Sequence, residues 1–463
     1  MPPDRLFTPR FFLMCGFSFT VFLSAFQLLP TAPFHILDLG GSTFASGLFL
    51  GFLTYSSAFS APLTGAYADR IGHRRMLLIS SIALAVFAAV YAVLTDYRLV
   101  LALAIVQGVF WSGLLSASAA YMTQMLPERR RAEGIGYWGL STMAALSVAP
   151  TVGFIIYRYG WVWLCVLAGA LNLVMLGIAI SLDEQPTITT PRPHSAGGLL
   201  EWRVLVTSLT LFLYSFGYGG ITSFAAMYAD ASGTTPKGIY LTALAIVVLC
   251  TRPFTGHLGD RIGYKRVFVP SLVMISVGLA CLAAGGSRFW MLTSALFFGI
   301  GFGTAYPNYV GYVMRGVSAE RRGAAFGAIL AAFDTGIGTG STSIGWLIQR
   351  FGFRSAFAVA AGLSALALPY FLMVDRVHGE QAKSQAPSSK SQDTPNSQGS
   401  PKSQVFSDWR LGVGSGWDLE LGAWSLTHVR NPFASRRRSF CPAWPPSAGR
   451  RTVRSSRPNS RLA

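Results

Sequence analysis

Long apolar segments follow one another along most of the chain. Between Phe11 and Met373, stretches of about twenty mainly apolar residues alternate with short breaks rich in charged residues, proline and glycine. A helix of roughly 20 such residues crosses the hydrocarbon layer of a membrane. The pattern predicts helices near 11–36, 44–68, 76–95, 98–122, 133–157, 161–182, 203–229, 238–257, 267–286, 289–314, 322–348 and 354–375. We therefore expect an all-α integral membrane protein with twelve transmembrane helices.

Composition and charge support this class and exclude others. Only 12% of the 463 residues are charged, against roughly a quarter in soluble domains. The net charge of +18 does not indicate nucleic-acid binding, because half of the excess falls after Asp375 and the rest fits a membrane-orientation signal. The five cysteines and six histidines are scattered, so we expect no disulfide framework, no metal site and no cofactor. No nucleophile–base pair emerges either, which argues against an enzyme.

The short loops differ in their content of basic residues. One set of loops holds sixteen Lys and Arg residues, and the opposite set holds six. Basic loops are retained on the cytoplasmic side of a membrane. The bias therefore predicts a multi-pass protein of the cell membrane (inner or plasma) with both termini in the cytoplasm.

An internal repeat divides the chain into two parts. Residues 60–75 read SAPLTGAYADRIGHRR and residues 251–266 read TRPFTGHLGDRIGYKR, with eight of sixteen positions identical at an offset of 191. The offset predicts two pseudo-symmetric six-helix bundles with a binding site between them near the middle of the membrane. The domains that we expect are an N-terminal half at 1–182, a cytoplasmic linker at 183–202, a C-terminal half at 203–375 and a disordered basic cytoplasmic tail at 376–463.

The segments GAYADRIGHRR and GHLGDRIGYKR resemble the loop signature of the major facilitator superfamily, which lies between helices 2 and 3 and again between helices 8 and 9. The resemblance implies the major facilitator fold and a latch that holds the cytoplasmic side shut. The implied latch residues are Gly65, Asp69, Arg70, Gly72, Arg74, Arg75, Gly256, Asp260, Arg261, Gly263, Lys265 and Arg266. Asp69 should face the start of helix 11, and Asp260 that of helix 5, where the helix dipole favours an anion. The alternative is that these are solvated loop charges that only set the orientation.

Helix 5 carries a weakened form of a motif of drug:proton antiporters in this superfamily. Gly136, Pro150 and Gly153 match it, whereas Ala145 and Ala149 replace two glycines and Phe154 replaces the last one. Helix 4 departs further, because Ala104 stands where the antiporter pattern has arginine. The chain thus resembles the drug:proton antiporter or sugar efflux permease branch, which implies efflux against an inward proton flow. Plain helix packing is the alternative for the helix 5 motif.

One acid lies well inside a predicted span. Asp334 falls in helix 11, where a carboxylate costs ~2.5–3.5 kcal/mol on insertion scales unless it faces a polar cavity. Apolar surroundings favour the neutral form of a carboxyl group, so Asp334 is the candidate for proton coupling. A structural hydrogen bond to a neighbouring helix is the alternative.

Helices 1, 4, 7 and 10 line the central cavity in the family that the chain resembles. Their candidate cavity residues are Gln27, Gln107, Tyr214, Tyr218, Tyr306 and Asn308. Aromatic faces with a few amides suit an amphipathic ligand, and packing is the alternative for each single residue. Arg252, late in helix 8, has three open roles: it reaches the membrane interface, pairs within the latch or binds an anionic substrate.

Together these features predict a secondary transporter that moves a small organic solute by alternating access. We expect protons as the coupling ion, the lipid bilayer as the surroundings and a monomer as the default state. Uptake by symport or facilitated diffusion is the alternative within transport, favoured by the missing helix 4 arginine. A non-transporting membrane sensor or assembly partner that uses the basic tail is the alternative from another class.

Overall fold

The computed structural model describes residues 6–127, 130–184, 202–315, 317 and 322–384, and all regular structure in these residues is α-helical. The helices are α1 (Pro9–Leu28), α2 (Ala32–Asp38), α3 (Thr43–Ile71), α4 (His73–Val93), α5 (Tyr97–Met125), α6 (Arg131–Tyr157), α7 (Trp161–Ser181), α8 (Trp202–Ala231), α9 (Ile239–Ile262), α10 (Tyr264–Ala284), α11 (Arg288–Arg315) and α12 (Arg322–Ser384). Most of the predicted linker and of the predicted tail lies outside the described residues.

Membrane-length helices account for nearly all of this structure. Within the described residues, ten helical segments are long and apolar enough to cross a membrane, and α1 and α2 together form one of them. The segment Ala325–Asp375 has 51 residues and bends at Gly352 (φ 78°, ψ 173°), so it makes two passes. With the shorter apolar helix Ile239–Arg252 of α9, the described helices provide twelve passes. The predicted all-α membrane fold is confirmed.

Local sequence signals set several helix ends. The Thr8 hydroxyl accepts a hydrogen bond from the Phe11 backbone N–H (3.2 Å) just ahead of Pro9, which starts α1. Gly72 ends α3 with φ 97° and ψ 139°, and Gly263 ends α9 with φ 94° and ψ 136°. Glycine adopts such positive φ values without steric cost. The two turns lie 191 residues apart, so the sequence repeat is also a repeat of backbone conformation.

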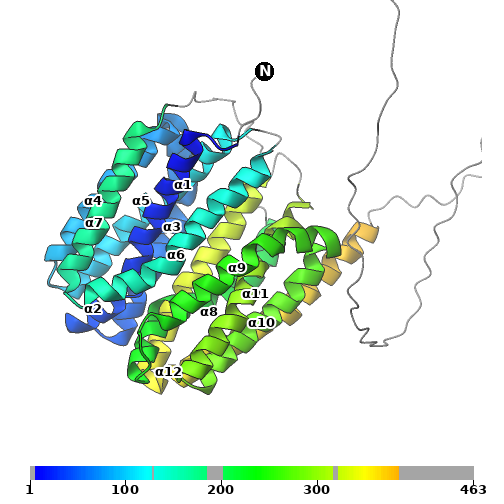
Figure 1. The fold of residues 1–463 in the computed structure, drawn as a ribbon. Coiled ribbons are helices and arrows are strands. Elements are labelled where there is room, and N and C mark those ends of the chain that lie inside the picture. The colour runs from blue at the N-terminus through cyan, green and yellow to red at the C-terminus, as the bar shows by residue number, and fades with distance from the viewer. Residues whose placement is uncertain (1–5, 128–129, 185–201, 316, 318–321, 385–463) are drawn as a thin grey trace, which may run out of the picture. The chain divides into compact units, whose positions relative to one another are not determined.

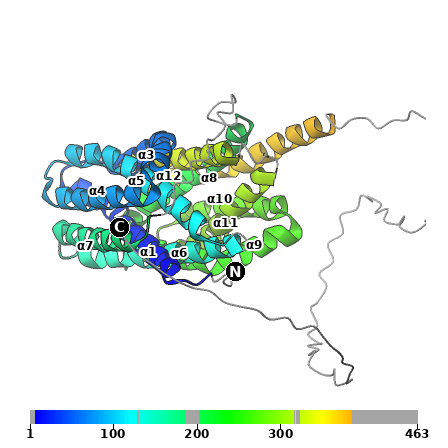
Figure 2. The same cartoon turned by 90° about the horizontal axis from the view of Figure 1, so that it is seen from above.

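Each half has its own hydrophobic core (Figures 1 and 2). One core is built almost entirely from α1 to α7, drawn blue to green-cyan, and the other from α8 to α12, drawn green to orange. The halves meet mainly along two helix pairs, α3 with α12 and α6 with α9. A site between the halves is therefore bordered by these four helices.

The two ends of the paired bundles differ in the hydrogen bonds that are described between the halves. We call the end where α7 finishes and α8 starts the linker face, and the other end the opposite face. Toward the opposite face, the Ser341 hydroxyl donates to the Gly47 carbonyl (2.8 Å) and the Phe44 N–H donates to the Gln349 side chain (3.2 Å). The hydroxyls of Thr151 and Thr242 lie 2.6 Å apart there. The described hydrogen bonds between α3 and α12 thus come from the middle of α3 and from its part nearer the opposite face.

Toward the linker face, apolar side chains of the same helices are exposed instead. Leu63 of α3 and Phe254 of α9 expose 74% and 73% of their surface, and they occupy equivalent positions of the repeat. Tyr67 and Leu258, one turn further on, expose 53% and 44%. Among the described residues, the hydrogen bonds between the halves therefore lie toward the opposite face and the middle of the helices, whereas these equivalent residues near the linker face leave apolar surface exposed.

Candidate substrate cavity and coupling site

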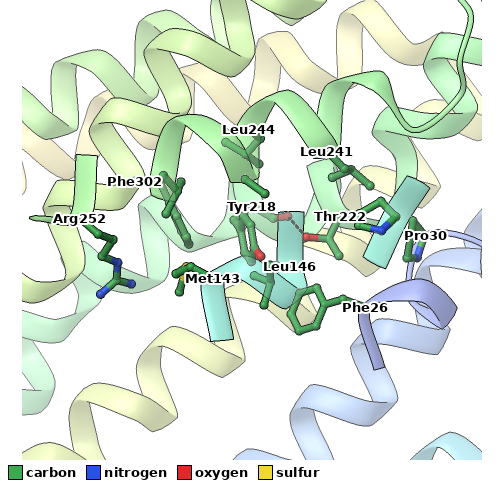
Figure 3. Close-up of a pocket in the computed structure, with 13 residues that line it drawn as sticks. Phe26, Pro30, Met143, Leu146, Tyr218, Thr222, Leu241, Leu244, Arg252 and Phe302 are labelled. Atoms are coloured by element: carbon green, nitrogen blue, oxygen red, sulfur yellow. Dashed lines mark hydrogen bonds between the residues drawn. The ribbon is translucent and has the colours of Figure 1, made fainter. Parts of the chain in front are cut away.

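A small cavity lies between the halves, near the middle of α6, α8 and α9. Its lining comprises Phe26 and Pro30 of α1, Met143, Leu146 and Pro150 of α6, Tyr218 and Thr222 of α8, Leu241, Leu244, Ala245, Val248 and Arg252 of α9, and Phe302 of α11. Its volume of about 60 Å³ holds a few water molecules, whereas organic ligands usually occupy sites of roughly 300–1,000 Å³. Figure 3 shows Arg252 at one end of the lining and Pro30 at the other. The cavity has to widen to accept a solute of ordinary size.

Aromatic rings of the C-terminal half form one wall of this region. The rings of Tyr218 and Phe302 stack with centroids 4.3 Å apart and planes 21° apart. Phe333 of α12 lies 6.0 Å from Phe302, 5.2 Å from Tyr306 and 6.3 Å from Tyr214, measured between ring centroids. The three predicted tyrosines therefore gather around two phenylalanines that the sequence analysis did not single out.

Arg252 brings a positive charge to this wall. Its electrostatic neighbours are the hydroxyl groups of Tyr306 and Tyr214, and its Nε atom is buried without a hydrogen-bond partner in the described part of the chain. None of the ion pairs recorded among the described residues involves Arg252. The guanidinium group is thus part of a mainly apolar cavity and has no described carboxylate beside it.

Asp334 lies at the contact between the halves. Its carboxyl group accepts a hydrogen bond from the hydroxyl of Ser57 on α3, and Ser57 is only 4% exposed. Asp334 itself is half-buried and interacts electrostatically with Tyr306, which also neighbours Arg252. The structure therefore places Tyr306 between the only acid predicted within a span and the arginine of the cavity wall.

Small residues bring α12 close to two other helices around Asp334. A Cβ atom added at Gly338 would lie 3.3 Å from the Gly51 carbonyl oxygen of α3, and one at Gly336 would lie 2.6 Å from the Phe212 carbonyl oxygen of α8. Glycine at these positions permits backbone contact between helices. One turn beyond Asp334, the Tyr55 and Thr339 hydroxyls are 2.8 Å apart across the same interface.

The other predicted cavity residues lie apart from this lining. Gln27 is fully buried, and neither polar atom of its side chain has a partner in the described part of the chain. Gln107 accepts a hydrogen bond from the Tyr91 hydroxyl (2.8 Å) inside the N-terminal half. The Asn308 amide donates to the Thr304 carbonyl of its own helix (2.7 Å). Of the six predicted residues, Tyr218 lines the cavity.

The motif predicted for the fifth transmembrane helix lies on α6, since α1 and α2 together form the first span, and it contributes to the cavity. Pro150 is part of the lining, and so is Met143, which the sequence analysis passed over. Gly153 faces α1, since a Cβ atom there would lie 2.7 Å from the Gln27 carbonyl oxygen. No heavy atom lies within 4 Å of such a position at Gly136. The motif residues thus differ in their surroundings, and two of the three lie where the halves or helices approach closely.

The two signature loops form ion pairs within their own halves. Arg75 pairs with Glu184 at 3.1 Å, and Lys265 pairs with Asp375. Glu184 and Asp375 are themselves 191 residues apart. Each loop is therefore tied to the end of the last helix of its own bundle, and the repeat offset points to both acids.

The structure describes the side chains of some of the remaining latch residues and not those of others. The Arg74 guanidinium donates to the Ile180 carbonyl (2.8 Å), and Asp69 lies 3.8 Å from the His73 ring. The linker face exposes the side chains of Arg70, Arg261 and Arg266. The side-chain surroundings of Gly256 and Asp260, and of the first residues of α12 that Asp69 is predicted to face, lie outside the described part of the structure.

Twelve helical passes in two repeated bundles around a central cavity define a multi-pass membrane transport protein. The sequence model of the family described as Major Facilitator Superfamily matches residues 11–250 and again residues 207–429. The chain belongs to the major facilitator superfamily.

Relatives and solved structures agree with this assignment. The uncharacterized MFS-type transporter YhhS of Escherichia coli (strain K12) is 23% identical over 369 residues, which cover 76% of this chain and 89% of YhhS. A bacterial homologue of the human lysosomal transporter Spinster, solved in an inward-facing and occupied conformation, matches with a TM-score of 0.69 at 14% identity over 79% of this chain and 96% of that one. The nucleoside transporter NupG matches with a TM-score of 0.65 at 17% identity, over 80% of this chain and all of that one. At these identities the structures show the fold alone.

Proposed function

We propose that this protein is a secondary active transporter that moves a small organic solute by alternating access and couples it to protons through Asp334. The observation that carries the proposal is the position of Asp334, whose carboxyl group bonds to Ser57 across the contact between the halves. A carboxyl group at such a contact is desolvated when the halves close and hydrated when they part. Desolvation favours its protonated form and hydration its charged form, so the movement of the halves controls the proton.

The conformation fits one step of this cycle. The described hydrogen bonds between the halves lie away from the linker face, near which the apolar residues Leu63 and Phe254 are exposed, and this supports a state in which the halves part at the linker face. The loop charges assign the linker face, with both termini, to the cytoplasm of a cell-membrane protein. On this assignment the protein is open to the cytoplasm, and the latch at Asp69 and Asp260 closes that side in the next step.

Efflux is the direction that the resemblance to the drug:proton antiporter branch favours. The solute would leave on the opposite face while a proton enters and returns Asp334 to its neutral form. Uptake by proton symport is the second candidate, and one observation favours it: Ala104 and the neighbouring apolar side chains leave α5 without the membrane arginine of antiporters. We treat the transporting unit as a monomer, since each chain contains both halves and the cavity between them.

Proton flux in everted membrane vesicles tests the proposal. The membrane is energised, and a panel of drugs, sugars and small metabolites is added while the pH gradient is followed by fluorescence quenching. We expect at least one compound to collapse the gradient with the wild-type protein and not with Asp334→Asn at equal abundance. Collapse on addition indicates efflux, whereas acidification driven by an inward solute gradient indicates symport.

The matched control is Asp96→Asn. Asp96 is an exposed carboxylate whose oxygen accepts the Arg98 backbone N–H at 2.8 Å, and asparagine caps a helix equally well. This variant should retain wild-type coupling. If Asp334→Asn keeps full gradient-dependent transport, Asp334 has no coupling role.

A further inference from the structure

The arginine of the cavity wall is chemically unusual for its surroundings. Arg252 lines a cavity whose other side chains are apolar or aromatic apart from Thr222 and the Tyr218 hydroxyl. Its Nε atom is fully covered and has no hydrogen-bond partner in the described part of the chain. An arginine inside a membrane is ordinarily paired or faces a water-filled or ligand-filled space.

Groups within the protein do not neutralise this charge in the described structure. The electrostatic neighbours of Arg252 are tyrosine hydroxyls. Asp334 shares the neighbour Tyr306 with Arg252, and its own hydrogen bond is to Ser57. A buried charge without a partner destabilises the protein, because its desolvation is not compensated. An anion that enters the cavity would relieve this cost, whereas a neutral ligand would not.

The repeat shows that the charge is not required by the fold. The position equivalent to Arg252 in the N-terminal half is Ala61, 191 residues earlier, and it belongs to the same signature segment. Helix α3 packs and turns at Gly72 in the same way as α9 does at Gly263 without any arginine there. Arg252 therefore has a role specific to the C-terminal half, which is the half that forms the aromatic wall.

The other residues of the cavity lining indicate the shape and polarity of the uncharged part of the ligand. Phe26 of α1 and Met143 of α6 face the stacked pair Tyr218 and Phe302 across the cavity (Figure 3). Flat apolar surfaces on both sides favour a flat apolar or aromatic body. Arginine presents a planar fork of N–H donors that matches a carboxylate in a bidentate geometry.

We propose that the transported solute is an amphipathic organic anion, with its carboxylate or similar acidic group on Arg252 and its apolar body between Phe26, Met143, Tyr218 and Phe302. This inference rests on the proposed transport function and names the substrate class. The Arg252 guanidinium supplies the donors for the acidic group, and no carboxylate stands among the lining residues to bind a positive charge instead.

Binding to the whole protein in nanodiscs of zwitterionic phosphatidylcholine tests this inference without any proton gradient. The probes are matched acid and amide pairs: benzoate with benzamide, 2-naphthoate with 2-naphthamide, and indole-3-acetate with indole-3-acetamide. Affinities are measured by isothermal titration calorimetry. We expect at least one acid to bind the wild-type protein tenfold or more tightly than its amide, and we expect Arg252→Gln to remove that preference.

Two further variants separate recognition from folding and from surface charge. Arg252→Lys keeps the positive charge but loses the planar fork, so it should retain part of the preference for the acid. Arg288→Gln removes an exposed arginine at the start of α11 and should retain all of it. Equal affinity for acid and amide in the wild-type protein overturns the inference, and so does an acid preference that survives in Arg252→Gln or is lost in Arg288→Gln.

These results are independent of the test of proton coupling. Acid binding that depends on Arg252, together with unchanged coupling in Asp334→Asn, would support the substrate class and reject the role of Asp334. Coupled transport without any dependence of binding on Arg252 would reject the substrate class and leave the transport function in place.

Discussion

The two halves of this protein share a backbone plan and differ in where they carry polar chemistry. Both halves repeat the same glycine turn and the same loop-to-helix ion pair, at Arg75 with Glu184 and at Lys265 with Asp375. Arg252, Asp334 and Tyr306 of the site lie in the C-terminal half, and the equivalent positions of the N-terminal half hold Ala61, Met143 and Leu115.

On the proposed function, this difference separates the residues of the repeat that hold each bundle together from those that bind the solute or the proton. Features that hold a bundle together are needed twice, once for each half. A charge that binds a solute or a proton is needed once, because the cavity is shared between the halves. The N-terminal half supplies an apolar surface at Met143, against which the C-terminal half places its functional groups.

The largest effect should come from comparing equivalent positions of the two halves. We expect Asp334→Ala to reduce gradient-driven transport to the level of empty vesicles, because alanine cannot carry a proton. Met143→Ala should change only the half-saturating concentration, by about two- to fivefold, which corresponds to about 0.4–1 kcal/mol of contact energy. Initial rates in proteoliposomes with an imposed pH gradient measure both. Similar losses in the two variants would contradict the division of roles.

The second-largest effect should come from substitutions in the two helix pairs that join the halves, α3 with α12 and α6 with α9. A Cβ atom at Gly47 would meet the backbone carbonyl of Ser341, which cannot move aside, so Gly47→Ala should weaken closure of α3 against α12. A Cβ atom at Gly238 would lie 3.2 Å from the Phe154 ring, which can shift, so Gly238→Ala should have less effect. Overpacking of this kind costs about 1–3 kcal/mol.

Cysteine accessibility distinguishes these two variants. A cysteine at Ser341, which is fully buried, is introduced into a chain without its native cysteines and labelled with a membrane-impermeant maleimide. Labelling should accelerate in Gly47→Ala and change little in Gly238→Ala. Equal acceleration in both would show that the α6–α9 contact is as rigid as the α3–α12 contact.

A smaller effect is expected from the repeated ion pairs. The side chains of Arg75 and Glu184 are 64% and 50% exposed, and exposed pairs contribute about 0.2–1 kcal/mol. Asp375 is only 17% exposed and also accepts a hydrogen bond from the Tyr312 hydroxyl. Lys265→Ala should therefore lower the melting temperature of the purified protein more than Arg75→Ala, by a few degrees against about one. An equal shift would mean that burial of Asp375 adds nothing to its pair.

The smallest effect should come from the region outside the repeat. Truncation after Ser384 keeps the whole of α12 and the Lys265–Asp375 pair and removes the predicted basic tail. A transporter whose site lies between the bundles should retain its transport rate. Loss of function at unchanged membrane abundance would instead favour the sensor or assembly role.

The sequence predicts the fold because its signal is repeated and redundant. Twelve apolar runs each report a membrane pass, and two copies of one loop fix the relation between the halves. Single polar residues are harder to place from sequence. Gln107 is in a helix that was expected to line the cavity, yet its side chain bonds to Tyr91 within its own bundle. Whether such a side chain faces the cavity depends on how its helix is rotated about its own axis. The sequence of a helix that is apolar on all sides carries little information on that rotation.

The same limit explains what sequence reasoning missed. Phe302 and Met143 line the cavity but are indistinguishable in the sequence from packing residues. Glu184 is different, because applying the repeat offset to Asp375 would have identified it as the partner of a signature arginine. Arg252 was recognised as significant, but its three open roles required knowledge of which groups surround it.

The α3–α12 contact also bears on how fast the protein can work. Gly51 faces Gly338 there, and Gly47 lies against Ser341 and Gly345, so small residues bring the two backbones together. Such a contact can part without repacking large side chains at these positions. The hydrogen bonds described across it are those of Ser341 with Gly47, Phe44 with Gln349, Ser57 with Asp334 and the Tyr55 hydroxyl with that of Thr339, each worth about 0.5–1.5 kcal/mol. Their combined strength is within the range of free energy that one bound solute supplies. A few weak hydrogen bonds between small residues therefore hold α3 against α12, which suits a contact that opens and closes in every transport cycle.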